Sequence, residues 1–150
     1  MNHRHSNITV KGLVAQDPRL ARLLLPALGE ALSSVASYTY RSLLTSEEQP
    51  EYSNLFDGLA NDALRHFRTL GELILALGGS PTVYAPAHGE APASLTLPAQ
   101  FLQESLLEEK ASVERFETLM GKTNNRVVRS ILSQIVLEKQ INLRRLSAAV

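Results

Sequence analysis

The stretch SPTVYAPAHGEAPASLTLP, at residues 80–98, decides the fold, because it separates two halves of strongly helical composition. It is rich in Pro, Ala and Gly, and at about 3.3 Å per residue it can span about 60 Å. A helix over residues 98–120 is only about 35 Å long. The stretch can therefore run the length of a helical bundle, so that the next helix starts at the opposite end.

Four long helices are predicted on the two sides of this stretch. Leu, Ala, Glu and Arg dominate them, whereas Val and Ile are too scattered for strands. Short polar turns join the first two helices and the last two, so each pair is expected to be antiparallel. The predicted helices cover residues 18–45, 50–78, 98–120 and 124–148. The fold class is therefore all-α: a four-helix bundle of two antiparallel helical hairpins joined by a long crossover at about residues 80–98.

Local signals set the expected boundaries. Residues 1–17 are polar and form a flexible N-terminal tail before a bundle of residues 18–150. Pro26 interrupts the first helix, so residues 18–25 are expected to be a short turn or a kinked lead-in. Pro50 suits a first helical position, and the glycines at 78–79 suit a helix stop. Thr123 or Asn124 is the expected N-cap of the last helix.

Composition excludes several classes of function. The chain has 150 residues, no cysteine, and 15 basic against 15 acidic residues. The absence of cysteine removes disulfides, thiolate metal sites and cysteine nucleophiles. Zero net charge argues against nucleic-acid binding, and no apolar run reaches the length of a membrane helix. Because the N-terminus lacks the apolar core of a signal peptide, we expect a cytoplasmic protein.

Three of the predicted helices carry an ionisable residue in the middle of their apolar stripe. These residues are His66, Glu109 and Glu138. Burying an unpaired carboxylate is unfavourable by several kcal/mol, so three such groups at a similar depth are expected to meet. Inward-facing Glu and His side chains on facing helices are also how helical bundles hold metal ions.

Two other interpretations stay open at this point. A single His on an apolar stripe is usually a hydrogen-bonded core residue, and a single Glu can lie at the stripe's edge with its carboxylate in water. The three residues can also meet without metal, as a hydrogen-bonded cluster in which His66 contacts Glu138 or Glu109.

Several segments carry a family resemblance that covers about residues 20–148. In the first half they are YTYRS at 38–42, LANDALRH at 59–66, LGELI at 70–74 and LGGSP at 77–81. In the second half they are EEK at 108–110, Phe116 and EKQI at 138–141. Together they resemble the ferritin-like superfamily, above all its bacterioferritin, rubrerythrin and manganese-catalase-like branches. The resemblance implies the same bundle with a long crossover.

The resemblance also implies a dinuclear metal site of which this chain keeps only part. In the family, each half supplies a Glu from its first helix and a Glu-x-x-His pair from its second. Carried over, the six ligand positions fall on Ala31, Ala63, His66, Glu109, Glu138 and Ile141. The family's third-helix Tyr is Phe116 here. Glu30 and Asp62 each precede a lost ligand, but either would need a helix rotation of about 100° to replace it.

Two carboxylates cannot neutralise two divalent ions, so an intact di-iron centre is not expected. The resulting hypothesis is a non-catalytic ferritin-like protein with a structural or protein-interaction role and no cofactor. The alternative is an oxidoreductase with one Fe, Mn or Zn ion on His66, Glu109 and Glu138. A basic last helix and an acidic third helix suit packing between neighbours or across a dimer, so the expected partner is a second copy or another protein.

Overall fold

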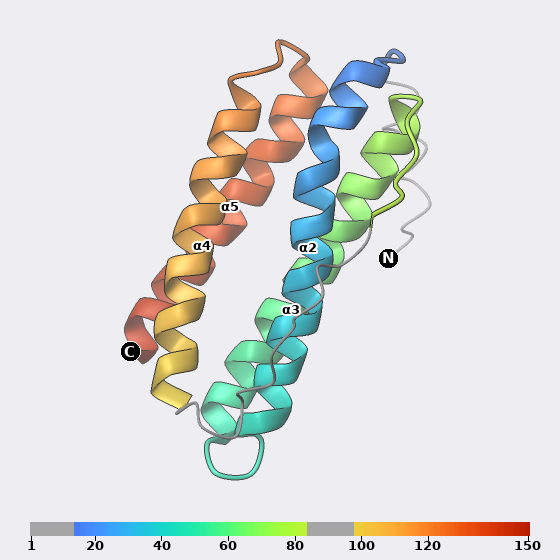
Figure 1. The fold of residues 1–150 in the computed structure, drawn as a ribbon. Helices are drawn as coiled ribbons and strands as arrows, with labels where there is room; N and C mark the ends of the chain where they lie inside the picture. Colours follow the sequence, from blue (N-terminus) through green and yellow to red (C-terminus); the bar gives the residue numbers. More distant parts are fainter. Residues whose placement is uncertain (1–13, 84–97) are drawn as a thin grey trace, which may run out of the picture.

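The structure, a computed structural model, describes residues 14–83 and 98–150, and these residues form an all-α bundle (Figure 1). Its helices are α2 (Pro18–Thr45), α3 (Pro50–Ala76), α4 (Pro98–Met120) and α5 (Arg126–Ala149). The first two form one antiparallel hairpin and the last two form the other. α4 starts at the end of the bundle opposite to the end of α3 (Figure 1). This arrangement confirms the predicted topology, although residues 84–97 of the crossover lie outside the described ranges.

Prolines and short polar side chains start the helices close to the predicted positions. The Asp17 carboxylate accepts a hydrogen bond from the Leu20 backbone N–H at 3.1 Å, and Pro50 occupies the first position of α3. The N-cap of α5 is Asn125, one residue later than predicted, and its side chain accepts from the Val128 N–H at 3.1 Å. These caps satisfy backbone donors that have no partner inside a helix.

The end of α3 is built by two glycines. Gly78 has φ 88°, a backbone conformation that side chains with a Cβ rarely adopt. A Cβ on Gly79 would lie 2.6 Å from the Cβ of Ala21, so only glycine allows this close approach to α2. The Asp17 N–H donates to the Leu77 carbonyl at 2.8 Å. The part of the predicted tail that the structure describes is therefore anchored to α3, while residues 1–13 lie outside the described ranges.

α2 is one helix and not the interrupted segment that Pro26 predicted. Pro26 lies inside it and is exposed, so water can bind the Arg22 carbonyl that loses its helical donor. By length and composition α2 is also apolar enough to cross a membrane, contrary to the expectation from the sequence. Core helices pass the same test, and the side chains of Leu24 and Leu28 are fully buried in the bundle.

The core consists of two apolar clusters separated by a polar layer. The upper cluster contains residues from the start of α2, the ends of α3 and α4, and the start of α5. The lower cluster is centred on Tyr38, Phe56, Phe101 and neighbouring leucines. Between the clusters, α3 contributes the small buried residue Ala63 and several polar ones lie buried on α3, α4 and α5, namely His66, Glu109, Ser112, Ser105, Lys139 and Asn142.

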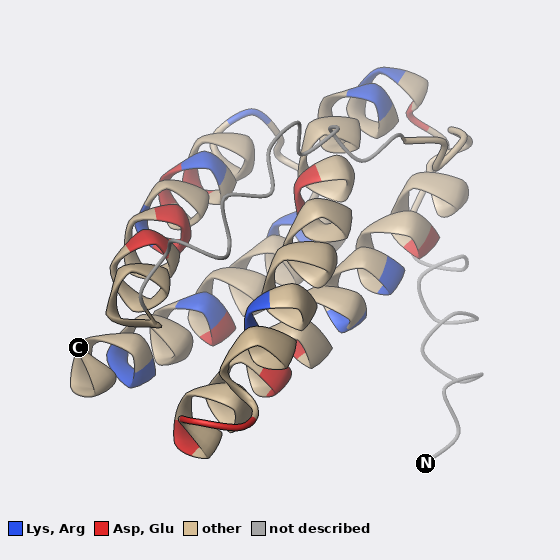
Figure 2. Cartoon of the chain, turned by 60° about the horizontal axis from the view of Figure 1, so that its bottom comes forward, with Lys and Arg blue, Asp and Glu red and all other residues tan. Residues whose placement is uncertain are grey.

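The two hairpins are joined by side chains of opposite charge. Acidic residues gather on α4 (Figure 2), and buried Arg41 of α2 reaches three residues there, Glu104, Ser105 and Glu108. The guanidinium donates to the Ser105 hydroxyl at 2.8 Å and to the Glu108 carboxylate at 2.9 and 3.0 Å. Nearer the start of α2, Glu30 pairs with Arg115 of α4. These contacts set the register between α2 and α4.

Candidate metal centre

His66 of α3 and Glu138 of α5 meet, as the cluster interpretation predicted. The Nε2 atom of buried His66 lies 2.5 Å from Oε2 of Glu138. The other oxygen of this carboxylate, Oε1, accepts from Arg65 Nη1 at 2.6 Å. The Glu138 side chain is 21% exposed, so this carboxylate lies at the edge of the core.

Glu109 has different partners. Its Oε1 accepts a hydrogen bond from the Tyr38 hydroxyl at 2.7 Å. Its Oε2 lies 3.5 Å from the ammonium nitrogen of Lys139, a residue that is only 7% exposed. The same ammonium lies 5.5 Å from the centre of the Phe116 ring, within the range of a cation–π contact. Glu109 is therefore neutralised by a buried lysine of α5.

The structure thus brings two of the three predicted side chains, His66 and Glu138, into contact. The third, Glu109, pairs with Lys139 instead. Across residues 14–83 and 98–150, no three His, Cys, Asp or Glu side chains are grouped so that they could hold a metal ion. The two neighbouring acids are also paired: Glu30 with Arg115, and Asp62 with Arg65 at 2.6 Å. Asp62 accepts a second hydrogen bond from Asn142 at 3.1 Å.

A family model for the ferritin-like domain matches residues 29–150. The chain belongs to the ferritin-like family. Two solved structures share the fold of this ferritin-like chain at 18% identity. One is the bacterioferritin of Desulfovibrio desulfuricans, described with its diiron site (TM-score 0.76, covering 95% of this chain and 81% of that one). The other is the bacterioferritin-related dodecameric thioferritin of Bacteroides fragilis (TM-score 0.75, 97% and 91%). A search of the curated proteins gives no match.

Burial identifies which α5 side chains of this ferritin-like bundle face the interior. Lys139 and Asn142 are the polar residues among them; they are three positions apart and 7% and 3% exposed. Ile141 is 39% exposed, and Glu138 lies at the edge. The buried residues of α5 are Val128, Leu132, Ile135, Val136, Lys139, Asn142 and Leu146, so the interior stripe passes through Lys139 and not through Glu138 as predicted.

The same spacing on α3 connects the buried residues Ala63 and His66. Interior positions therefore favour Lys139 and Asn142, one residue later than Glu138 and Ile141, as the counterparts of the family's second Glu-x-x-His pair. Neither residue was predicted from the sequence, although both continue the regular stripe that ends at Leu146.

The side chains present do not fit a dinuclear metal centre. All four carboxylate oxygens of Glu109 and Glu138 already face protein donors, which are Tyr38, Lys139, Arg65 and His66. The two carboxylates are balanced by two cations, Lys139 and Arg65. A divalent ion added here would bring uncompensated positive charge, or would have to displace both cations.

Burial and hydrogen bonds shift the pKa values of this cluster. Burial lowers the pKa of His66 below its usual value of 6.5, and the nearby charge of Lys139 adds to this effect. Burial by itself would raise the pKa of Glu138, but hydrogen bonds from His66 and Arg65 outweigh it and lower the pKa. Neutral His66 therefore donates its Nε2–H to an ionised Glu138.

These shifts predict that acidification destabilises the fold. Because the pKa of folded His66 lies below 6.5, the unfolded chain takes up a proton first as the pH falls through that value. Glu138 acts in the same direction at lower pH, since its folded pKa lies below 4.5. We expect the free energy of unfolding in urea to fall between pH 7.5 and 5.5, and to fall less in the variant His66→Gln. Equal losses in parent and variant would contradict the role of His66.

Proposed function

We propose that this protein is a ferritin-like subunit without dinuclear metal chemistry, whose role is structural and depends on association with copies of itself or with another protein. The observation that carries the proposal is the buried ion pair between Lys139 and Glu109. An ammonium group there supplies the positive charge that the buried carboxylate requires, so the core is neutral without a metal ion.

The replacement of the family's metal-ligating side chains around this pair supports the same conclusion. Ala31 and Ala63 are buried and apolar where the family has carboxylates, and Asn142 is engaged with Asp62. With Lys139, these differences leave His66 and Glu109 as the interior residues that match the family's ligands. The alternative, one ion on His66, Glu109 and Glu138, requires Lys139 and Arg65 to leave their carboxylates.

Exposed apolar side chains support the association part of the proposal. Leu43 of α2 and Leu107 of α4 are 68% and 65% exposed, and further large apolar side chains lie on the outer faces of the helices. Such residues are often buried when copies associate. The Bacteroides neighbour is described as dodecameric. We infer a homo-oligomer for this chain, with a dimer as its smallest unit.

Elemental analysis tests the metal part. Protein expressed in medium rich in iron and manganese, and purified without chelators, is expected to contain only substoichiometric iron, manganese or zinc. It should also leave the rate of Fe(II) oxidation in air unchanged. A full equivalent of metal retained per chain would overturn the proposal in favour of the single-metal alternative.

Light scattering coupled to size exclusion tests the association part separately. We expect a mass of at least two chains at micromolar protein concentration. A monomer that forms no complex with other proteins at such concentrations would contradict the structural role, whatever the metal content.

A further inference from the structure

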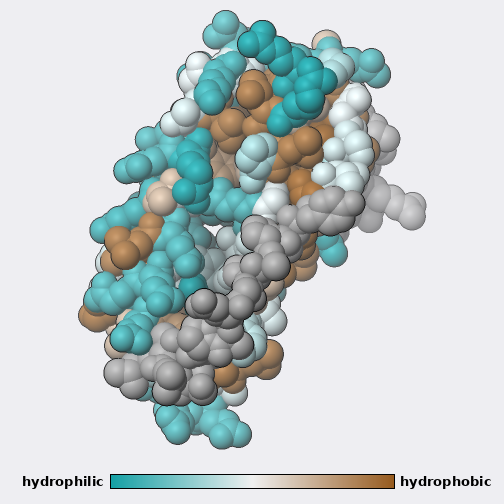
Figure 3. All heavy atoms as spheres, viewed as in Figure 1, coloured by the Kyte–Doolittle hydropathy of each residue, from teal (hydrophilic) through white to brown (hydrophobic). Residues whose placement is uncertain are grey.

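A groove of about 820 Å³ runs between α2 and α4, in the half of the bundle where α2 begins and α4 ends. Volumes of this size are typical of small-molecule sites. Its lining includes the apolar side chains of Leu23, Ala27, Phe116 and Leu119. Figure 3 shows apolar side chains exposed in this upper half of the molecule, with hydrophilic residues around them.

Small residues explain why the two helices leave this space. Gly29, Ser33 and Ala111 line the inner end of the groove, where α2 faces α4. Larger side chains at Ser33 and Ala111 would fill the gap between the helices, as the buried leucines do between α2 and α3, whereas a Cβ on Gly29 would lie 4.0 Å from the Cβ of Val83. Small residues on both helices therefore leave room for the groove.

Charge is unevenly distributed along the groove. The helices are antiparallel, and Glu30 pairs with Arg115. Arg22, about two turns before Glu30, is consequently level with Lys122, about two turns after Arg115. Arg22 and Lys122 are both exposed, and neither has an ion-pair partner among the residues that the structure describes. The free carboxylate of the lining, Glu114, lies toward the inner end.

We propose that this groove binds an aliphatic carboxylate. The hydrocarbon chain lies along half-buried Leu23 and Leu119, above a floor formed by buried Ala27 and Phe116, and the carboxylate pairs with Arg22 and Lys122 at the outer end. An apolar lining with two unpaired cations at one end matches a ligand that has one anionic head and an apolar tail. Glu114 at the other end disfavours the reverse orientation. This site does not depend on the proposed function, because it involves none of the polar side chains between the two core clusters.

A second copy of the chain suits this groove less well. Two copies related by a twofold axis across the groove would place one concavity against the other, which leaves both unfilled. In such a dimer the charges of Arg22 and Lys122 would stay unpaired unless both side chains reached Glu114 of the second copy. Association through the groove is therefore kept as an outcome of the test.

Calorimetric titration with sodium dodecanoate, below its micellar concentration, tests the proposal. We expect the full chain to bind dodecanoate saturably. Dodecan-1-ol serves as a second probe, which has the same chain length but no charge. The variant Arg22→Gln/Lys122→Gln should bind dodecanoate about tenfold more weakly or worse, because it loses the charge-assisted contacts. Its affinity for dodecan-1-ol should not change.

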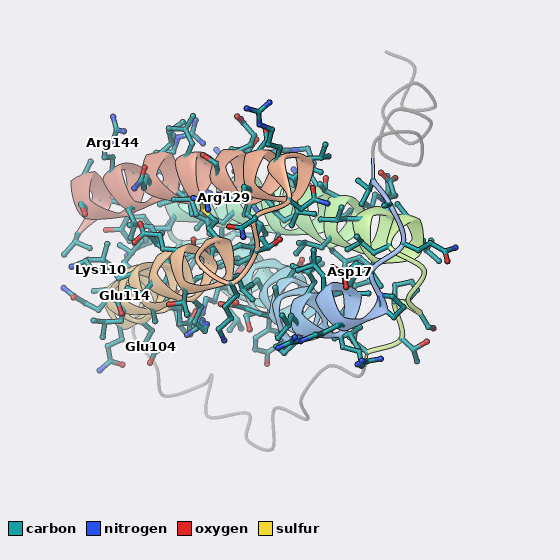
Figure 4. The ribbon with its side chains drawn as sticks, turned by 90° about the horizontal axis from the view of Figure 1, so that it is seen from above. Asp17, Glu104, Lys110, Glu114, Arg129 and Arg144 are labelled. Carbon is teal, nitrogen blue, oxygen red and sulfur yellow. The ribbon has the colours of Figure 1, made fainter. Side chains whose placement is uncertain are left out.

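The matched control is Arg144→Gln/Arg145→Gln, which removes two exposed cations from the far end of α5. Arg144 lies on the outer side of α5, away from the start of α2 (Figure 4). This control is expected to bind dodecanoate like the parent. A second variant, Ala111→Leu, keeps both cations but fills the inner end, and should weaken the binding of both probes.

Four results would overturn the proposal. Three concern binding: dodecanoate does not bind saturably, the groove and control variants weaken its binding equally, or Ala111→Leu has no effect on binding in a folded chain. A fourth is a change of oligomeric mass in Arg22→Gln/Lys122→Gln, since it would show that a second copy occupies the groove. Circular dichroism of each variant confirms that it is folded before the titration.

Discussion

Replacing Lys139 with methionine is expected to lower the free energy of unfolding by about 3–5 kcal/mol, because the carboxylate of Glu109 then stays buried without its cation. Methionine has a similar length and keeps an apolar contact with Phe116, so the change removes charge more than volume. Urea denaturation at pH 7.5 measures the effect. The decrease should be among the largest for a single substitution in this chain.

Two further variants separate the ion pair from other causes. Lys110→Met makes the same chemical change at an exposed lysine of α4 (Figure 4), and it should alter stability by no more than about 0.5 kcal/mol. The double variant Lys139→Met/Glu109→Gln removes both charges and should recover most of the loss, since the glutamine oxygen can still accept from Tyr38. If Lys139→Met is as stable as the parent, the pair does not neutralise the core.

The bundle could be predicted from the sequence because its determinants are local. Prolines, glycines and N-caps mark the helix boundaries, and the length of the stretch at residues 80–98 decides the topology. The interruption predicted at Pro26 is absent for a local physical reason. A proline inside a helix removes one hydrogen bond and crowds the preceding turn, but Pro26 lies on an exposed face, where water can replace the lost donor.

The candidate site could be predicted only in part. The contact of His66 with Glu138 was foreseen, but the partner of Glu109 was not. Spacings of three and four residues from Val128 lead equally well through Ile131 to Glu138 or through Leu132 to Lys139. Lys and Glu are both rarely buried unless they are paired, so the sequence alone does not choose between Glu138 and Lys139. Only the position of Glu109 on α4 shows that Lys139 has a carboxylate to pair with.

The groove could not be predicted at all. Small residues at positions 29, 33 and 111 are compatible with close helix packing as well as with a gap. Which of the two occurs depends on how the hairpins are held apart, and that is set by long-range pairs such as Glu30 with Arg115. Neither partner of such a pair identifies the other in the sequence.

A chain with Ala31→Glu, Ala63→Glu, Lys139→Glu and Asn142→His is expected to bind about two Fe(II) ions and to oxidise them in air. With His66 and Glu109, these changes supply four carboxylates and two imidazoles at interior positions. They also remove the ammonium that occupies the centre. Metal stoichiometry and the rate of Fe(II) oxidation, measured on parent and variant together, give the result.

The matched control is the triple variant Ala31→Glu, Ala63→Glu and Ile141→His, which follows the register expected from the sequence. It keeps Lys139 against Glu109 and places its new imidazole at a position that is 39% exposed, so it should not bind two ions. Because unpaired buried carboxylates destabilise the metal-free chain, the melting temperature should rise on adding Mn(II) only in the quadruple variant. A folded quadruple variant without this response would show that Lys139 and Asn142 do not mark the ligand positions. Two ions bound by the triple variant would assign those positions to Glu138 and Ile141 instead.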